Sequence, residues 1–404
     1  MQTFIRNSVA VGVLALCAGA QAQISDGVVK IGVLTDMAGP YSGMGGAGSV
    51  VAARMAVEDC LKAECKDMKI EVVSADHQNK ADIAATRARE WMDRDKVDAL
   101  ADLTNSAGAL AIQKLIKEKG GIALYSGPAT TRLTNEDCAS NGFHWMFDTY
   151  SSASGAAAAL TQAGFKSWYF LTVDYAFGHS LEKDASDVVK AQGGTVLGSV
   201  RHPLNASDFS SFMLQAQSSK AQVIGLANGA QDTVNAIKAA REFGVDGKEQ
   251  RVAALLMFLT DVHSLGLNQA QGLLFSEGFY WDMDDKTRAF AARFEKLHKG
   301  YKPTMVQAGV YSSVLHYLKS VAAAKTDDWK VVAQKMRDLP IQDPIMRNAS
   351  IRPDGRVVHD MYLFQVKKPS ESKGAWDYYN TVSTVPAQIA FKPLADSTCP
   401  LVKK

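Results

Sequence analysis

Short apolar runs alternate with amphipathic stretches along most of the chain, and this alternation restricts the possible folds more than any other feature. Runs of strand length, rich in β-branched residues, fall at Val28–Thr35, Ile70–Ala75 and Val97–Leu103. The stretch 81–92 between two of them places its apolar residues on one stripe of a helix. Strands that alternate with helices indicate parallel sheets built from βαβ units.

The same pattern starts again in the second half of the chain. Apolar runs at Trp168–Val173, Thr195–Val200, Val223–Ala227 and Val252–Met257 are again separated by helical stretches. The chain has 404 residues, whereas a single core stops growing at about 250–300 residues. We therefore predict an α/β fold with two doubly wound parallel-sheet lobes, divided near Phe147–Gly155, onto which the C-terminal third packs back.

The N-terminus carries the features of a secretory signal peptide. Arg6 supplies positive charge, Ser8–Ala20 is an apolar run of about 13 residues, and Ala20-Gln21-Ala22 fits an A-x-A cleavage site. The run is shorter than the ~20 residues that span a bilayer as a helix. Cys17 raises the alternative of a lipoprotein, but Leu16 before it is bulky for such processing. We predict removal of residues 1–22 and export to the periplasm.

Export changes the meaning of the cysteines, because four remain after cleavage in an oxidising compartment. Four cysteines allow three pairings. Cys60 and Cys65 bracket a short polar turn and can pair locally, which leaves Cys138 for Cys399 and pins the C-terminal tail across the chain. We predict this pairing over the other two. A metal site is the competing interpretation, but the sequence has no C-x-x-C and its histidines are scattered, so we expect no metal.

Charge and motifs argue against a nucleic-acid-binding protein and against an enzyme. The 44 basic and 42 acidic residues are balanced, so no electrostatic footprint for nucleic acid is present. The chain lacks G-x-S-x-G, H-E-x-x-H and P-loop motifs. Gly43–Gly48 matches G-x-G-x-x-G, but seven residues separate it from the end of the strand at Thr35. This gap argues against an NAD-dependent Rossmann enzyme, which stays only as the alternative. We expect no enzyme activity and no cofactor.

Polar residues follow the predicted strands where parallel strands place their carboxyl ends. Thr104-Asn105-Ser106 precedes a helix, and Ser126–Thr131, which includes Gly127, Ala129 and Thr130, follows the next strand. Hydroxyl groups, free backbone N–H groups and a helix N-terminus suit an anion. The simpler alternative for the first stretch is a plain helix cap. Two such edges side by side favour a small anionic ligand.

The first strand and its loop, Val29–Thr35 with Gly39–Gly43, together with Asp174–Gly178 and Gln307–Tyr311, are similar to segments of a known family. In their order and spacing they resemble the periplasmic solute-binding proteins of ABC importers, of the branched-chain amino-acid (leucine/isoleucine/valine) type. The resemblance covers about residues 24–404.

The resemblance implies a type I, Venus-flytrap fold whose lobes are joined by three crossover strands, near Phe147–Thr149, Phe279–Trp281 and Val358–Tyr362. The expected lobes are residues 23–147 with 281–358, and residues 148–280 with 359–404. The tail of the second lobe would return to the first through Cys138–Cys399.

The resemblance also implies the site. In this family the ligand carboxylate is held by positions that match Asn105, Ser106, Ala129 and Thr130, an aromatic residue matching Phe177 covers the ligand, and Tyr150 lies near the hinge. Asp261 is the nearest match to the acidic residue that pairs with an α-ammonium group, while Asn228 stands where an aromatic residue is often found. The full predicted ligand set is Tyr41, Asn105, Ser106, Gly127, Ala129, Thr130, Tyr150, Phe177, Asn228, Asp261 and Tyr280.

At Asn228 and Asp261 the sequence departs from the residues usual in this family, and two ligand classes are therefore expected. The first is a branched-chain or related amino acid, and the alternative is an aromatic carboxylate without an ammonium group. The expected partners are this small carboxylate and an ABC permease in the inner membrane, and we expect a monomer that binds no nucleic acid. A ligand-sensing receptor module with the same fold is the remaining alternative.

Overall fold

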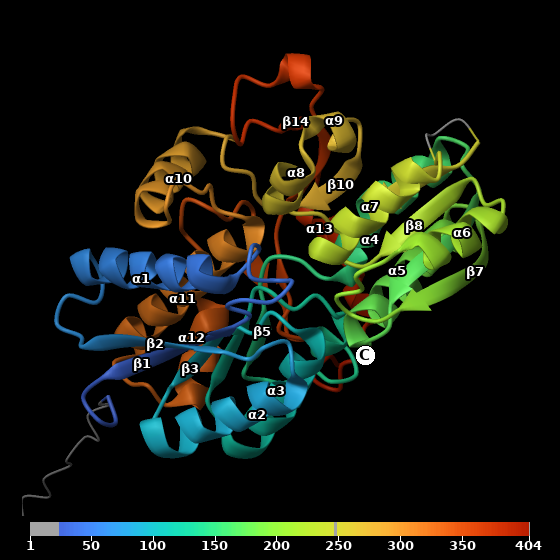
Figure 1. Cartoon of the computed structure of the whole chain (residues 1–404). Helices are drawn as coiled ribbons and strands as arrows, with labels where there is room; N and C mark the ends of the chain where they lie inside the picture. The colour runs from blue at the N-terminus through green and yellow to red at the C-terminus, as the bar shows by residue number, and fades with distance from the viewer. Residues whose placement is uncertain (1–23, 246–248, 404) are drawn as a thin grey trace, which may run out of the picture.

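The computed structural model describes residues 24–245 and 249–403, and its elements gather into two lobes (Figure 1). The first lobe is built on a parallel five-stranded sheet, sheet A, with the order β2-β1-β3-β4-β5. Its strands are β1 (Val29–Thr35), β2 (Ile70–Asp76), β3 (Ala99–Asp102), β4 (Ile122–Tyr125) and β5 (Gly142–His144).

Alternate residues of these strands face opposite layers of helices, because side chains alternate across a strand. Val29, Ile31 and Val33 share a core with α1 (Gly46–Lys62) and α11 (Met305–Ala324). Leu34, Leu100 and Tyr125 belong to a separate core with α2 (Ala81–Glu90) and α3 (Ser106–Lys119). Sheet A is therefore covered on both faces, as an open parallel sheet requires.

The second lobe repeats this arrangement on a parallel four-stranded sheet, sheet B, with the order β7-β6-β8-β9. Its strands are β6 (Ser167–Val173), β7 (Thr195–His202), β8 (Val223–Ala227) and β9 (Arg251–Ala254). Helices α4 (Thr149–Gln162) and α5 (Ala176–Ala191) cover one face, and α6 (Ser210–Ser218) and α7 (Gln231–Glu242) the other. The predicted α/β fold with two parallel sheets is confirmed.

A third sheet, sheet C, does not follow the βαβ pattern. It is antiparallel, with the order β10-β13-β14, and consists of β10 (Leu274–Glu277), β13 (Met361–Val366) and β14 (Tyr379–Val385).

The remaining elements are α8 (Leu259–Leu265), α9 (Leu267–Ala270), α10 (Asp285–Leu297), α12 (Trp329–Asp338), α13 (Ala387–Ala390), the hairpin β11 (Ser350–Ile351) and β12 (Val357–Val358), a π-helical turn at Trp91–Asp95, and 3₁₀ turns at Thr131–Thr134, Pro369–Glu371 and Leu394–Asp396.

The segments that are predicted to connect the lobes meet near one buried arginine, Arg356. Arg356 donates to the carbonyl oxygens of Trp145 and Phe147 at 2.7 and 2.9 Å, which joins the first predicted crossover to the third. Gly278, beside the second predicted crossover, packs closely against His359 and Met146. A side chain at Gly278 would collide with them, because its Cβ would lie 2.7 Å from His359 Cε1 and 3.1 Å from Met146 Cε. The lobe boundaries within these segments stay predictions.

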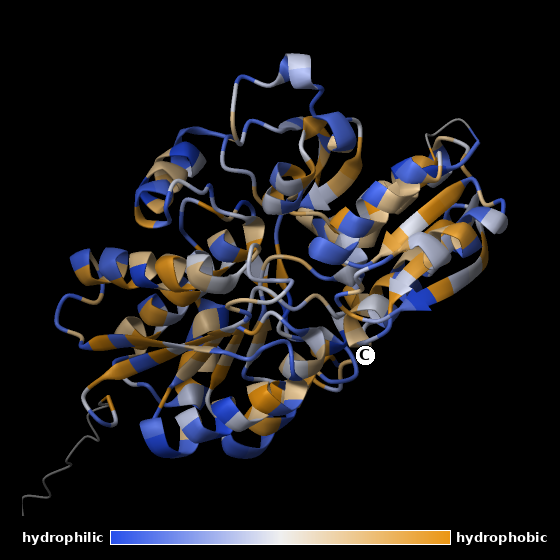
Figure 2. Cartoon of the chain, in the orientation of Figure 1, coloured by the Kyte–Doolittle hydropathy of each residue, from blue (hydrophilic) through white to orange (hydrophobic). Residues whose placement is uncertain are grey.

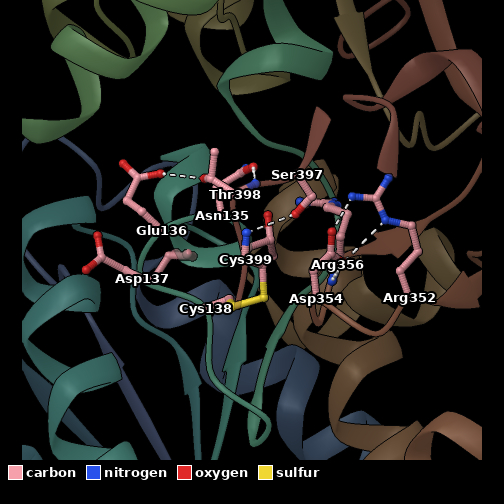
Figure 3. The surroundings of a disulfide bond; sticks show 12 residues. Asn135, Glu136, Asp137, Cys138, Arg352, Asp354, Arg356, Ser397, Thr398 and Cys399 are labelled. Carbon is pink, nitrogen blue, oxygen red and sulfur yellow. Dashed lines mark hydrogen bonds and ion pairs between the residues drawn. A yellow bond between two sulfur atoms is a disulfide. The ribbon is translucent and has the colours of Figure 1, made fainter. Parts of the chain in front are cut away.

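Both predicted disulfides are present. Cys60 and Cys65 join neighbouring positions at the end of α1, whereas Cys138 and Cys399 are 261 residues apart in the sequence. Figure 3 shows the second bond beside Asn135, whose side chain accepts from Thr398 N at 3.3 Å. The C-terminal tail is thus tied to the first lobe.

Apolar residues gather in the sheets and on the inner faces of the helices, while polar residues cover the outer helix faces (Figure 2). Among the described residues, no helix combines the length and hydropathy needed to cross a bilayer. The predicted signal peptide, residues 1–22, lies outside the described residues.

Candidate functional site

A narrow cavity lies between the two lobes, at the carboxyl ends of sheets A and B. It is lined by Tyr41, Met44, Thr104, Ser106, Gly127, Ala129, Tyr175, Phe177, Gly229, Leu256 and Phe258. Its volume, measured as room for the centre of a water molecule, is about 10 Å³, so it holds about one water. The lobes are therefore closed on each other, and a ligand can enter only when they separate.

The first lobe contributes the polar wall of the cavity. Ser106 is the first residue of α3, and its hydroxyl accepts from the backbone N–H groups of Ala129 and Thr130 at 3.2 and 3.3 Å. This contact brings together the two strand ends that the sequence marks as polar. A hydroxyl group and N–H groups beside a helix N-terminus can hold a carboxylate without a basic side chain.

The second lobe contributes an apolar wall. Phe177, in the first turn of α5, and Leu256 both lie within 3.6 Å of the position of a Cβ on Gly229, so a side chain there would narrow the cavity. Phe258, at the start of α8, packs edge-on against Phe147 with ring centres 5.9 Å apart. A flat or branched apolar group fits between such walls.

Hydroxyl groups join the lobes beside the cavity. The Tyr41 and Tyr175 hydroxyl oxygens are 2.6 Å apart, and those of Thr130 and Ser180 are 2.7 Å apart. Burial raises the pKa of Tyr41 and of Tyr175 well above the usual value. Both tyrosines therefore stay neutral and can donate as well as accept hydrogen bonds.

A buried carboxylate adds a third contact between the lobes. Asp184, in α5, accepts from Thr131 and Thr149 hydroxyls at 3.0 and 2.5 Å. Burial, the largest effect, raises the pKa of Asp184 to about 6, while the Thr149 hydrogen bond opposes the rise.

Of the eleven predicted ligand residues, five line the cavity: Tyr41, Ser106, Gly127, Ala129 and Phe177. Asn105 caps α3 by accepting from Gly108 N at 3.0 Å, and the Thr130 hydroxyl faces Ser180. Tyr150 is half-buried in α4, outside the cavity lining.

The other three predicted residues belong to structural networks of the second lobe. Asn228 is fully buried, and its side-chain oxygen accepts a hydrogen bond from the Thr233 hydroxyl at 2.8 Å. Asp261 turns back to accept from Phe258 N at 2.9 Å, and burial raises its pKa to about 7. The Tyr280 hydroxyl donates to Trp376 O at 2.9 Å, away from the cavity lining.

Six lining residues are absent from the predicted set: Met44, Thr104, Tyr175, Gly229, Leu256 and Phe258. Thr104 stands in a predicted strand-end segment, and Tyr175 lies in the segment Asp174–Gly178 that carries the family resemblance. The positions of these two residues were therefore predictable, but their side-chain contacts with the cavity were not. Met44 lies in the glycine-rich loop of 43–48.

That loop has a packing role. A Cβ on Gly48 would lie 2.2 Å from Gln307 Nε2, which itself donates to Gly45 O at 3.0 Å. The glycines therefore let α1 approach α11 closely. Within residues 24–245 and 249–403, no three His, Cys, Asp or Glu side chains group as a metal site requires.

Comparison with known proteins gives a consistent result. The family model described as "Periplasmic binding protein" matches residues 28–375. A periplasmic binding protein from Burkholderia mallei is 50% identical, with 94% of this chain and 100% of the other covered and a TM-score of 0.91. A protein of Burkholderia xenovorans, described as a branched chain amino acid ABC transporter periplasmic ligand-binding protein, is 41% identical over 92% of this chain and 99% of the other, with a TM-score of 0.82.

A more distant solved structure shares the fold. A solute binding protein of an ABC transporter from R. palustris, in complex with 4-hydroxybenzoate, is 22% identical over 90% of this chain and 98% of the other, with a TM-score of 0.80. The family match, the two-lobed fold and the cavity between the lobes agree with one another. The chain belongs to the type I periplasmic binding proteins of the branched-chain amino-acid-binding type, and it is a periplasmic ligand-binding protein of an ABC transporter.

Proposed function

We propose that the ligand is a small carboxylate without an ammonium group, and that an aromatic carboxylate suits the site best. One observation carries this proposal: among the described residues that line the cavity, none has a charged side chain. The Ser106 hydroxyl, which accepts from Ala129 N and Thr130 N, keeps its own proton to donate to a carboxylate at one end. Phe177, Leu256 and Phe258 supply an apolar slot at the other.

The chemistry of an ammonium group argues against an amino acid at this site. A buried cation needs a charged or strongly hydrogen-bonding partner, because desolvation without one is costly. Asp261 uses a carboxylate oxygen to cap α8 at Phe258 N. Burial raises the pKa of Asp261, which disfavours the charged form that a cation would need as its partner.

A branched-chain amino acid is the second candidate, and the relative from Burkholderia xenovorans favours it through its description. In that case Asp261 would have to ionise and turn toward the ligand when the lobes close. The two candidates therefore differ in their dependence on Asp261.

Calorimetric titration of the protein with benzoate, 4-hydroxybenzoate and L-leucine separates the candidates. We expect a benzoate-type acid to bind and leucine not to bind. Asp261→Asn should leave binding of the aromatic acid within about threefold, since no bond to the ligand is lost. Leucine binding that disappears in Asp261→Asn would instead establish the amino-acid candidate.

Ser106→Ala tests the carboxylate end with either ligand. Loss of a charge-assisted hydrogen bond should weaken binding by about 1–3 kcal/mol, and Ser218→Ala, an exposed serine on α6 that bonds its own helix, is the matched control. Unchanged affinity in Ser106→Ala would remove Ser106 from the site.

We further propose that the protein acts as a monomer after cleavage behind Ala22, delivers its ligand to an inner-membrane permease, and catalyses no reaction. Intact-mass measurement of the exported protein tests the cleavage site, and light scattering tests the monomer. Recovery of the ligand unchanged after prolonged incubation would support binding without catalysis, and a product would contradict it.

A further inference from the structure

A buried carboxyl group without a hydrogen bond lies beside the cavity. Asp102 ends β3 just before the loop that carries Thr104 and Ser106, and its side chain is fully buried. Among the described residues, neither of its carboxylate oxygens has a hydrogen-bond partner within 3.5 Å, although the hydroxyl groups of Thr35, Ser49 and Thr104 lie close enough to lower its pKa. Buried acceptors are normally paired, because an unpaired one has lost its hydrogen bonds to water without replacing them. Asp102 therefore calls for a functional explanation.

The carboxyl group lies against backbone that forms the cavity wall. A Cβ on Gly127 would lie 2.4 Å from Asp102 Oδ1, and a Cβ on Gly45 would lie 2.8 Å from Oδ2. Gly127 lines the cavity, and its N–H donates to the Asp102 carbonyl oxygen at 3.2 Å. Only the thickness of one backbone segment thus separates the carboxyl group from the ligand space.

The backbone at this point is strained. Asp102 and Leu103 have φ angles of 71° and 62°, in the left-handed region that residues with a side chain rarely adopt. Such conformations are energetically unfavourable and concentrate at ligand sites. The two residues set the direction in which the chain leaves β3 toward Thr104 and Ser106.

The groups that face the carboxyl come from three elements. Thr35 of β1, Ser49 of α1 and Thr104 of the loop present hydroxyl groups, and the Asp36 carboxylate is the nearest acidic neighbour. Burial is the largest effect and raises the pKa of Asp102 to about 6; the three hydroxyls lower the pKa and Asp36 raises it. The Ser49 hydroxyl also lacks a partner, so a donor is at hand when Asp102 ionises.

We propose that Asp102 is a positioning residue that couples ligand binding to protonation: its neutral form supports an anionic ligand at the Ser106 loop, and its ionised form weakens binding. The proposal rests on the proposed carboxylate ligand. Two negative charges separated by one backbone segment in a dry site repel each other. By linkage, the bound anion favours protonated Asp102 and the proton favours the anion. Binding above the pKa of Asp102 therefore takes up a proton.

The test is calorimetry of the full chain with benzoate between about pH 5.5 and pH 8, a range in which benzoate stays ionised. For the wild type we expect affinity to fall on the order of tenfold toward pH 8, which corresponds to a coupling of about one pKa unit. Asp102→Asn keeps the shape but removes the charge. Its affinity should stay constant within about twofold and should exceed that of the wild type at pH 8.

Other acidic groups near the cleft require a control. The pKa values of Asp184 and Asp232 are raised to about 6 and that of Asp261 to about 7, in each case mainly by burial. Asp184→Asn, Asp232→Asn and Asp261→Asn should each retain the pH dependence that Asp102→Asn abolishes. Titrations in two buffers of different ionisation enthalpy should show proton uptake near pH 7 in the wild type and much less in Asp102→Asn.

The outcomes separate this proposal from the proposed function. Benzoate binding with the same affinity at all pH values, or a pH dependence that persists in Asp102→Asn, would overturn the role of Asp102 and leave the carboxylate ligand standing. No benzoate binding at any pH would count against the aromatic ligand alone. In that case the same pH series with L-leucine decides: a loss of affinity toward pH 8 that Asp102→Asn abolishes supports the proposal, and a pH dependence that Asp102→Asn retains overturns it.

Discussion

The hydroxyl oxygen of Tyr41 lies 2.6 Å from that of Tyr175, and this hydrogen bond joins the two lobes beside the ligand cavity. Tyr41 follows β1 in the first lobe, and Tyr175 immediately precedes α5 in the second. Both side chains line the cavity. The bond exists only when the lobes are closed, so it contributes to closure rather than to the stability of either lobe.

Tyr175→Phe should therefore favour the open form. Loss of one neutral hydrogen bond costs about 0.5–1.5 kcal/mol, so we expect ligand affinity to fall between about twofold and tenfold, with an unchanged melting temperature for the free protein. Small-angle scattering checks the closed fraction and calorimetry the affinity. Tyr301→Phe, at an exposed tyrosine, is the matched control; an equal loss there would contradict the assignment.

Arg356→Ala should destabilise the connection between the lobes severely. The substitution leaves the carbonyl oxygens of Trp145 and Phe147 unpaired and removes the partner 3.5 Å from buried Asp148. Breaking such a buried pair costs about 3–5 kcal/mol, measurable by urea denaturation. The control Arg87→Ala, which breaks an exposed ion pair with Glu90, should lower stability by less than about 1 kcal/mol. Similar values for both variants would contradict a stabilising role for the buried contacts of Arg356.

The two disulfides should differ in their contribution to stability. Cys138→Ser with Cys399→Ser opens a loop of 261 residues, whereas Cys60→Ser with Cys65→Ser opens one of five. Because loop-closure entropy grows with loop length, we expect a loss of about 5–6 kcal/mol for the first pair and about 2 kcal/mol for the second. Thermal unfolding measures both, and the reverse order would indicate that the tail contributes little.

Asp102→Asn should stabilise the free protein at neutral pH. The pKa of Asp102 is about 6 in the folded protein against 3.8 in the unfolded chain, so its favourable contribution is complete below about pH 3.8 and is lost as the pH rises through 6. Two pKa units correspond to about 3 kcal/mol. The variant should exceed the wild type by up to that amount at pH 7.5, and the difference should vanish near pH 4. Denaturant titrations at both pH values check this.

The parallel sheets were predictable because inner strands such as β3, β4 and β8 are buried on both faces and therefore appear as continuous apolar runs. The strand β14 (Tyr379–Val385) was missed for the opposite reason. It is an antiparallel strand at the edge of sheet C and is mostly exposed, with polar Asn380, Thr381, Ser383 and Thr384. Its position depends on pairing with β13, which local sequence does not encode.

The site was predictable where it follows strand ends and unpredictable where it depends on side-chain direction. Ser106 and Phe177 sit in the first turns of helices that leave the sheets, so the fold alone places them at the cleft. Asp261 was predicted toward the ligand, but its carboxylate turns back to Phe258 N and leaves the Phe258 ring in the cavity. The hydrogen bond from Phe258 N to the Asp261 carboxylate therefore decides that Phe258, and not Asp261, faces the cavity. The ligand roles of all eleven residues stay predictions.

The bond between Cys138 and Cys399 also changes the connectivity of the molecule. Residues 138–399 form a covalent ring that contains the whole of sheets B and C and the three segments predicted to connect the lobes. A protease that cuts once in any exposed loop of this ring opens it without releasing a fragment. A nicked molecule should thus migrate as two pieces only after reduction, and before reduction its lobes remain tethered and able to meet again around a ligand.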